Sequence, residues 1–378
     1  MHLIQGEYID MRYVISIDWL SLFCTQDADE FVGVSGLSDT IDAAYPWEYR
    51  REDYGTRQFK HLTRVSMPNE EGGRDEFAEV QSEPCSKILH RRSVIVRFVN
   101  RVLYRHDFWE LAGIFLRDNR LTFQSISRID ICADFNDFAT LSPYQLIQGF
   151  AEQKFRHIGR GVGALYFDHG VRRDALDTTP RYGVRYTGLS FGTHSSDARV
   201  YLYNKSFELA TQGDKPWIRD KWTSAGLDVR TVWRLEVSLK SKACKFRDKT
   251  FNQDVVVDCS ACKEREHLQM IYHTFVRKLF SFIRNREGIT NVTREPRLLL
   301  FSGKAWVERS VIRNVTGSNR LDRMVIKALY TLADVYRGTD VHECAAYADT
   351  LANVIASSTD LEQWFADKSE FWDKQNHR

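Results

Sequence analysis

The chain has 378 residues, of which 43% are hydrophobic and 13% aromatic, so it can bury a substantial core and divide into two or three domains. Its 53 Lys and Arg residues against 51 Asp and Glu residues leave a formal net charge of only +2. This balance excludes a uniformly basic nucleic-acid-binding chain, so any contact with nucleic acid must come from local patches. Two basic patches are visible, at 87–120 and 277–313.

The seven cysteines are odd in number in a long chain, which argues against a disulfide framework. The pair Cys259-x-x-Cys262 lacks the second close cysteine pair that a structural zinc site usually needs. The first ten residues do not have the basic and apolar regions of a signal peptide, and no apolar run approaches the roughly 18 residues of a membrane span. We therefore expect a cytoplasmic protein with reduced thiols and no membrane partner.

Hydrophobic periodicity predicts alternating strands and helices along the first two thirds of the chain. In the first part we expect strands at 12–24, 54–66, 75–83, 92–104 and 121–135, with helices at 106–119 and from Ser142-Pro143 to about 156. In the second part we expect strands near 163–168, 186–193, 198–207 and 230–240, with a helix near 216–225. From about 264 the pattern is helical, apart from a short strand at 297–302.

These elements predict an α+β fold in which antiparallel sheets carry helices on one side, followed by a helical C-terminal region. We place the α+β domain at 1–260, in two halves of about 1–156 and 157–260, and a mainly helical region at 261–378. The helical region is a candidate for binding DNA.

One polar strand face is predicted in 127–135, S-R-I-D-I-C-A-D-F. Alternation places Arg128, Asp130 and Asp134 on the side opposite the isoleucines. The two carboxylates are four residues apart, about 13 Å in an ideal strand, so only a bulge would let both reach one ion. Asp130, in mid-strand, is the stronger candidate for a metal ligand; the alternative is an ordinary surface strand.

A second polar face is predicted in 232–240, V-W-R-L-E-V-S-L-K. Glu236 lies between Arg234 and Lys240 on this face, and neighbouring positive charge would keep it ionised. An ionised carboxylate is a suitable oxygen ligand for a hard divalent cation. A solvent-facing charged strand is again the alternative.

A third polar face is predicted in the second strand of a hairpin at 188–208, where Arg199, Tyr201, Tyr203 and Lys205 alternate with apolar residues. A tyrosine can attack phosphorus if nearby cations stabilise its phenolate and hold the phosphate. Most tyrosines in strands only pack, which is the alternative interpretation.

These three segments resemble, in order, motifs of the replication initiation factor family, the rolling-circle initiators of small plasmids and filamentous phages. Relaxases of some conjugative elements are related to this family. The similar stretches are R-I-D-I-C-A-D at 128–134, the glycine and S-D of 192–197 followed by Y-N-K-S-F-E at 203–208, and R-L-E-V at 234–237. The opening I-D-W-L-S-L-F at 17–23 is also similar. The resemblance covers about 16–240 and implies two related antiparallel-sheet halves, as in the relaxase core.

The resemblance also implies a reaction, in which a tyrosine attacks origin DNA beside a divalent cation, forms a 5′-phosphotyrosine and frees a 3′-OH. By position it implies Tyr203 as the nucleophile, with Lys205 steadying the phosphate. Tyr201 occupies the place of a family arginine, so Tyr201 is a second candidate nucleophile. No His-hydrophobe-His pair occurs, so we expect carboxylates to hold Mg²⁺ or Mn²⁺. The candidate metal ligands are Asp130, Glu236, Asp134 and Glu208, and the candidate DNA-binding residues are Arg128, Arg199, Arg234 and Lys240.

The first functional hypothesis is therefore an initiator that nicks and rejoins origin DNA, single-stranded or extruded as a hairpin. The resemblance adds a host helicase, a polymerase and a second copy of the chain as candidate partners. A relaxase for conjugative mobilisation would use the same chemistry. A non-catalytic module that binds single-stranded nucleic acid on an aromatic sheet face is the third hypothesis.

Overall fold

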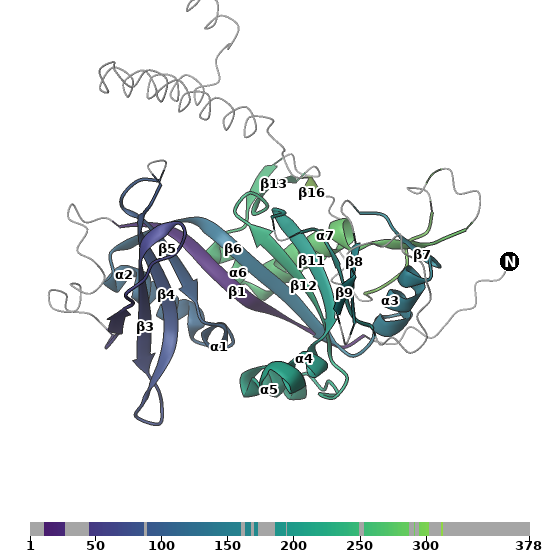
Figure 1. The fold of residues 1–378 in the computed structure, drawn as a ribbon, viewed down its shortest axis with the longest axis horizontal. Coiled ribbons are helices and arrows are strands. Elements are labelled where there is room, and N and C mark those ends of the chain that lie inside the picture. Colours follow the sequence, from purple (N-terminus) through teal and green to yellow (C-terminus); the bar gives the residue numbers. More distant parts are fainter. Residues whose placement is uncertain are drawn as a thin grey trace, which may run out of the picture. The chain divides into compact units, whose positions relative to one another are not determined.

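The computed structural model describes residues 11–26, 45–86, 89–159, 163–167, 170–172, 186–193, 195–248, 253–286, 291, 295–301 and 311–312 (Figure 1). Its contacts divide the chain into one unit at Met1–Arg313 and another at Asn314–Arg378. The part of the predicted helical region that follows residue 312 lies outside the described residues. Within the described part, no helix has the length and apolar character needed to cross a membrane.

Eleven of the described strands form one large antiparallel sheet, in the order β2-β3-β4-β5-β1-β6-β12-β11-β10-β8-β9. The bounds are β1 Tyr13–Gln26, β2 Glu48–Arg51, β3 Phe59–Pro68, β4 Arg74–Pro84, β5 Ser93–Phe98, β6 Leu121–Phe135, β8 Gly163–Phe167, β9 Gly170–Arg172, β10 Tyr186–Phe191, β11 Ala198–Asn204 and β12 Trp233–Lys240. Two small sheets pair β13 (Lys245–Asp248) with β14 (Gln253–Val256) and β16 (Val311–Ile312), and β7 (Phe155–His157) with β15 (Phe282–Arg284). The predicted α+β class is confirmed.

The first and second parts of the chain join edge to edge in this sheet, where β6 pairs with β12. Arg234 lies opposite Asp134, and Ser238 lies opposite Asp130. Since β12 also pairs with β11, the three polar strand faces predicted from the sequence become neighbours.

The helices of the described residues are α1 (Asn100–Leu103), α2 (Phe108–Asp118), α3 (Pro143–Ala151), α4 (Lys205–Gln212), α5 (Pro216–Ser224), α6 (Cys259–Lys263) and α7 (Arg265–Leu279). Helix α7 packs against β11 and β12, on the far side of the sheet in Figure 1. Its Ile271 and Phe275 lie in the same core as the buried apolar face of β12, and the Tyr272 hydroxyl donates to the Leu235 carbonyl at 3.0 Å. Residues 261–279 thus belong to the same packed unit as the sheet.

Local capping explains where two of the predicted elements end. Ser142 and Gln145 form a reciprocal capping box at the start of α3, which ends at Ala151, earlier than expected. The strand expected at 198–207 ends at Asn204, because the Asn204 side chain accepts from the Phe207 backbone N–H and caps α4. Lys205 therefore begins a helix instead of continuing the strand.

The strand expected at 297–302 is not formed by the described residues of that stretch. Residues 298–301 have no regular secondary structure, and Arg297 makes an isolated antiparallel bridge with Ile283.

A second apolar cluster covers one end of the polar face of the central strands. Leu209 of α4 packs with Ile218 and Trp222 of α5, and with Val232 just before β12. The Trp222 indole N–H donates to Asp134 Oδ2 of β6 at 2.7 Å. Helix α5 therefore both buries apolar surface and satisfies a buried carboxylate.

We expect Trp222→Phe to lower the free energy of unfolding by at least roughly 1.5–3 kcal/mol, because it removes a hydrogen bond to a buried charged group. The matched control is Trp217→Phe, which removes a neutral bond from a half-buried indole to Asn100 and should cost roughly 0.5–1.5 kcal/mol. Urea unfolding followed by circular dichroism measures both. Equal losses would contradict a special role for the Trp222–Asp134 bond.

Candidate active site

The polar faces of β6, β12 and β11 align in rows of side chains across the sheet, because residues opposite each other in the register point to the same side. Successive rows are two residues apart, which is roughly 7 Å along the strands. From the α5 end, the rows are Asp134, Arg234 and Tyr203; Cys132, Glu236 and Tyr201; Asp130, Ser238 and Arg199; and Arg128 with Lys240. The fold thus brings candidates from three distant segments onto one face.

The Tyr203 hydroxyl lies between the carboxyl group of Glu236 and the ammonium group of Lys205. It donates to Glu236 Oε2 at 3.2 Å and accepts from Lys205 Nζ at 3.4 Å. Lys205 is only 2% exposed although it begins α4, and its ammonium also pairs with Glu208 at 2.5 Å. Burial, followed by the charge of Glu236, raises the pKa of Tyr203 well above its ordinary value. The hydroxyl is therefore protonated at rest, with partners fixed on both sides.

Tyr201 stacks on Tyr203, with ring centroids 4.5 Å apart and an interplanar angle of 25°. Gly188 of β10 lies opposite Tyr203 and leaves room for this arrangement. A Cβ atom on Gly188 would lie 2.8 Å from the Leu202 carbonyl and 2.9 Å from the Tyr201 ring, which is too close. The glycine at this position therefore allows the second ring to lean over β10.

Arg234 is fully buried and organises the end of the face nearest α5. Its Nε and Nη2 donate to the two oxygens of Asp134 at 2.6 and 2.7 Å, and its Nη1 donates to Asp18 of β1. Its Nη2 also donates to the Tyr104 hydroxyl at 3.1 Å. With no exposed surface, Arg234 is not positioned to contact DNA, which corrects its assignment as a DNA-binding residue. Both oxygens of Asp134 are occupied by Arg234 and Trp222, so its position is that of a structural partner.

Asp18 is a residue of this cluster that the sequence did not single out. It lies where the β1–β6 register shifts between Ile17 and Trp19, and it accepts from the Tyr104 hydroxyl at 3.0 Å and from Asn100 Nδ2 at 3.1 Å. Burial would raise its pKa, but Arg234 and Lys205 hold the pKa below the ordinary range. Asp18 is therefore ionised. In the sequence, Asp18 is marked only by the I-D-W stretch of the family resemblance. Alternation does not indicate its position, because it does not reveal the bulge.

Asp130 is buried and held by Arg128. Arg128 Nε donates to Asp130 Oδ1 at 2.9 Å and Nη2 donates to Oδ2, while the guanidinium lies 4.6 Å from the centre of the Trp19 ring. Burial raises the pKa of Asp130 in spite of this pairing. A carboxylate has about four lone-pair positions, so Asp130 can still offer an oxygen to a cation.

Glu236 behaves differently from the expectation that its neighbours keep it ionised. Burial, and then the charges of Asp130 and Asp18, raise the pKa of Glu236 to about 8. Arg234 opposes this shift, but its charge is already shared by Asp134 and Asp18. Asp130 and Glu236 thus form a pair of mutually repelling carboxylates, the kind of arrangement that a bound cation stabilises.

The donor set fits a cation that takes one or two protein carboxylates and completes its shell with water and substrate phosphate, as Mg²⁺ commonly does. Among the described residues, no group of three or more His, Cys, Asp or Glu side chains is arranged to hold a metal ion. Glu208, in the first turn of α4, is engaged by Lys205. Asp130 and Glu236 are therefore the carboxylates left for such an ion.

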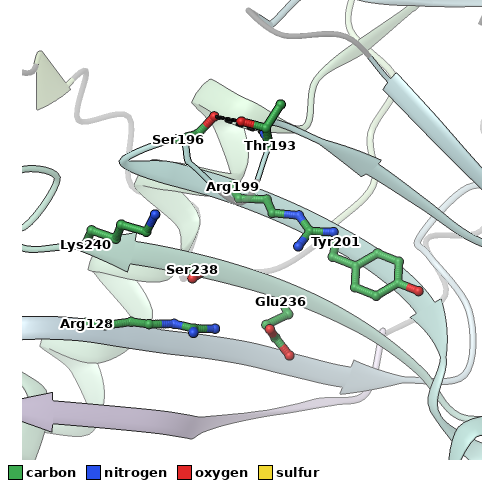
Figure 2. Close-up of a pocket in the computed structure, with 8 residues that line it drawn as sticks. All are labelled: Arg128, Thr193, Ser196, Arg199, Tyr201, Glu236, Ser238 and Lys240. Carbon is green, nitrogen blue, oxygen red and sulfur yellow. Dashed lines mark hydrogen bonds between the residues drawn. The ribbon is translucent and has the colours of Figure 1, made fainter. Parts of the chain in front are cut away.

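A polar pocket with a volume of about 70 Å³ opens beside Glu236 (Figure 2). Arg128, Lys240 and Arg199 line it from β6, β12 and β11, and the β10–β11 turn adds hydroxyl groups. The complete lining is Arg128, Thr193, Ser196, Arg199, Tyr201, Glu236, Ser238 and Lys240. Three of the four predicted DNA-binding residues therefore meet here, and Tyr201 reaches the pocket as well.

Among solved structures, the chain is similar to one titled "Structure of Rolling Circle Replication Initiator Protein from Geobacillus stearothermophilus". The alignment covers 76% of this chain and 92% of that chain, with 14% sequence identity and a TM-score of 0.39. No family model matches the chain, and no curated protein matches it. Similarity at this level does not assign a function, so the function must be inferred from the side chains.

The raised pKa of Glu236 predicts a pH-dependent stability in protein freed of divalent cations. The stabilisation from protonated Glu236 is fully present below its ordinary pKa of 4.5 and is lost as the pH rises through about 8. Glu236→Gln removes this loss, so the variant should gain stability relative to the parent protein between about pH 5.5 and about pH 8.5. Urea unfolding of both proteins in EDTA at the two pH values measures this gain. A difference between variant and parent that stays constant with pH would contradict the prediction.

Proposed function

We propose that the chain is a DNA strand transferase that nicks and rejoins origin DNA through a tyrosine, as a rolling-circle replication initiator does. The observation that carries the proposal is the position of the Tyr203 hydroxyl, between Glu236 Oε2 and Lys205 Nζ on the same sheet face as Asp130. A phenol held between an acceptor and a cation, beside a pair of carboxylates, suits attack on a phosphodiester.

In the proposed reaction the Tyr203 oxygen forms a bond to phosphorus as the bond from phosphorus to the 3′ oxygen breaks. The products are a 5′-phosphotyrosine and a strand that ends in a free 3′-OH, and the reverse reaction rejoins the strand. Burial raises the pKa of Tyr203, so the phenol keeps its proton until attack; the proton then leaves by way of the hydrogen bond to Glu236, and the departing 3′ oxygen takes up a proton from water. Glu236 accepts the phenol hydrogen bond, and the Lys205 ammonium stabilises the developing phenolate.

We assign the cation, Mg²⁺ or Mn²⁺, to Asp130 and Glu236, and its chemistry would be to neutralise charge on the scissile phosphate. Glu208 is assigned to Lys205, because the two side chains pair directly, and Asp134 to the support of Arg234. Tyr203 is preferred to Tyr201 as nucleophile, since its hydroxyl has both Glu236 and Lys205 as partners. Tyr201 lines the pocket, where a ring can stack on a base.

The proposed partner is origin DNA, single-stranded or extruded as a hairpin. A host helicase, a polymerase and a second copy of the chain follow from the family resemblance alone. A conjugative relaxase would use the same site. It would differ from a replication initiator in the DNA that it cleaves and in its need for a transfer apparatus.

A non-catalytic single-strand-binding module is the second candidate. It is favoured by the half-buried rings of Tyr166 and Tyr201, whose centroids lie 4.9 Å apart and which flank Arg199. This candidate predicts binding without a covalent adduct, so adduct formation separates the two functions.

We expect the protein to form a denaturation-resistant adduct with single-stranded DNA in Mn²⁺, and Tyr203→Phe to abolish it while binding is retained, because phenylalanine keeps the ring and lacks the nucleophile. A random single-stranded library serves as the substrate, because it contains many candidate origin sequences. Gel analysis and peptide mapping identify the attached residue. Tyr201→Phe is the matched control and should keep the adduct; an adduct that survives Tyr203→Phe but not Tyr201→Phe would reverse the assignment.

We expect Asp130→Asn and Glu236→Gln each to lower Mn²⁺-dependent adduct formation at least ~10²-fold, because each removes a charge that would hold the cation. Glu208→Gln is the comparison variant, and it should leave the Mn²⁺ concentration for half-maximal activity unchanged. Titration of adduct yield with Mn²⁺ measures this dependence. Full activity in EDTA would contradict the cation assignment.

A further inference from the structure

We infer that the pocket in Figure 2 is a subsite for one backbone phosphate of the bound strand, next to the phosphate that Tyr203 attacks. The identity of the strand as single-stranded DNA rests on the proposed function. The inference that a phosphate binds here rests on the charge, the volume and the fixed side chains of the pocket.

The lining of the pocket favours a small anion. Arg128, Arg199 and Lys240 reach it from three adjacent strands, and hydroxyls of Thr193, Ser196 and Ser238 complete its polar wall. Its volume of about 70 Å³ is several times the roughly 10–15 Å³ that a cavity needs to hold one water molecule, so it admits a small group such as a phosphate. Guanidinium groups bind phosphate oxygens in pairs, which makes arginine a frequent phosphate ligand.

Two of the cationic groups are held in place before any ligand binds. Arg128 is fixed by its fork on Asp130 and by the Trp19 ring beneath it. Arg199 Nη2 donates to the Tyr166 hydroxyl at 3.1 Å, and its guanidinium lies 5.5 Å from the centre of the Tyr201 ring. Binding therefore orders few additional side-chain rotamers, which favours affinity.

The charges around the pocket indicate which anion it takes. Three cations face it, while Glu236 lines one wall and Asp130 lies behind Arg128. This leaves a small excess of positive charge, which matches the single negative charge of a phosphodiester better than the several charges of a nucleoside triphosphate.

The position of the pocket relative to Tyr203 indicates a neighbouring phosphate. Arg199, Arg128 and Lys240 lie in the third and fourth rows of the face, and the Tyr203 hydroxyl reaches Glu236 in the second. The separation is thus one to two row spacings, roughly 7–14 Å. A DNA strand that runs along the direction of β11 and β12 can place one phosphate at Tyr203 and another in the pocket.

The test is the salt dependence of binding to a fluorescein-labelled oligothymidine, followed by anisotropy. Each phosphate contact on a single strand contributes about 0.7 to the slope of log K against log salt. We expect Arg199→Gln and Lys240→Gln each to weaken binding, and the double variant to lower the slope by about 0.7, the loss of one phosphate. A fall of about 1.4 would mean two separate phosphates, and an unchanged slope would mean no contact; either result overturns the proposal.

The controls separate a local effect from a general loss of charge or fold. Arg50→Gln with Lys154→Gln removes two cations whose side chains are 72% and 71% exposed and which do not line the pocket, and should leave the slope unchanged. Lys240→Arg keeps the charge and should keep the slope, which guards against misfolding as the cause. A slope that falls by about 0.7 while Tyr203 forms no adduct supports the subsite and refutes the nicking function. An adduct at Tyr203 with an unchanged slope supports the nicking function and refutes the subsite.

Discussion

The buried guanidinium of Arg234 is the interaction on which the polar face depends. It binds Asp134 of β6 through two bonds and Asp18 of β1 through a third, and so joins three neighbouring strands. Removing one partner of a buried charge pair costs roughly 3–5 kcal/mol, because the other charge is left uncompensated in the interior. This constraint fixes the lateral position of β1, β6 and β12, and with it the rows of side chains that lead to the pocket.

The same interaction divides the charges of the face into two groups. Near α5, the charge of Arg234 is shared by Asp134 and Asp18, and the three side chains pair with one another. Farther along the strands, Arg199, Lys240 and Arg128 line a pocket. Glu236 is buried at the boundary between the two groups, and this burial, with the charges of Asp130 and Asp18, raises its pKa to about 8. A bound cation would compensate the carboxylates at this boundary, and a bound phosphate would compensate the arginine and lysine side chains of the pocket.

Alternation in the sequence predicted which side chains share the face of each strand, because the period of two is a property of the strand itself. It could not predict that β6 and β12 are neighbours, since pairing between strands so distant in sequence depends on the whole sheet. Nor could it find Asp18, which a bulge turns toward Arg234. The expectation for Glu236 failed because alternation does not reveal that Glu236 is buried beside Asp130 and Asp18. Arg234 is near in sequence, but its charge is shared with partners on other strands. Lys205 was assigned to the wrong element, yet its long side chain still reaches the Tyr203 hydroxyl from the first turn of α4.

The two stacked tyrosines differ in what their surroundings allow them to do. Tyr203 is buried, and its oxygen is held by Glu236 and Lys205, so its position varies little while its proton is costly to remove. Tyr201 borders the pocket and leans over Gly188, so its ring can contact a ligand that binds there. A nucleophile gains more from a fixed position and a ready cation than from exposure, because alignment with the scissile bond lowers the barrier directly. The burial that raises the pKa of Tyr203 also strengthens the field of Lys205 on the phenolate, so the cost of ionisation is offset where the charge develops.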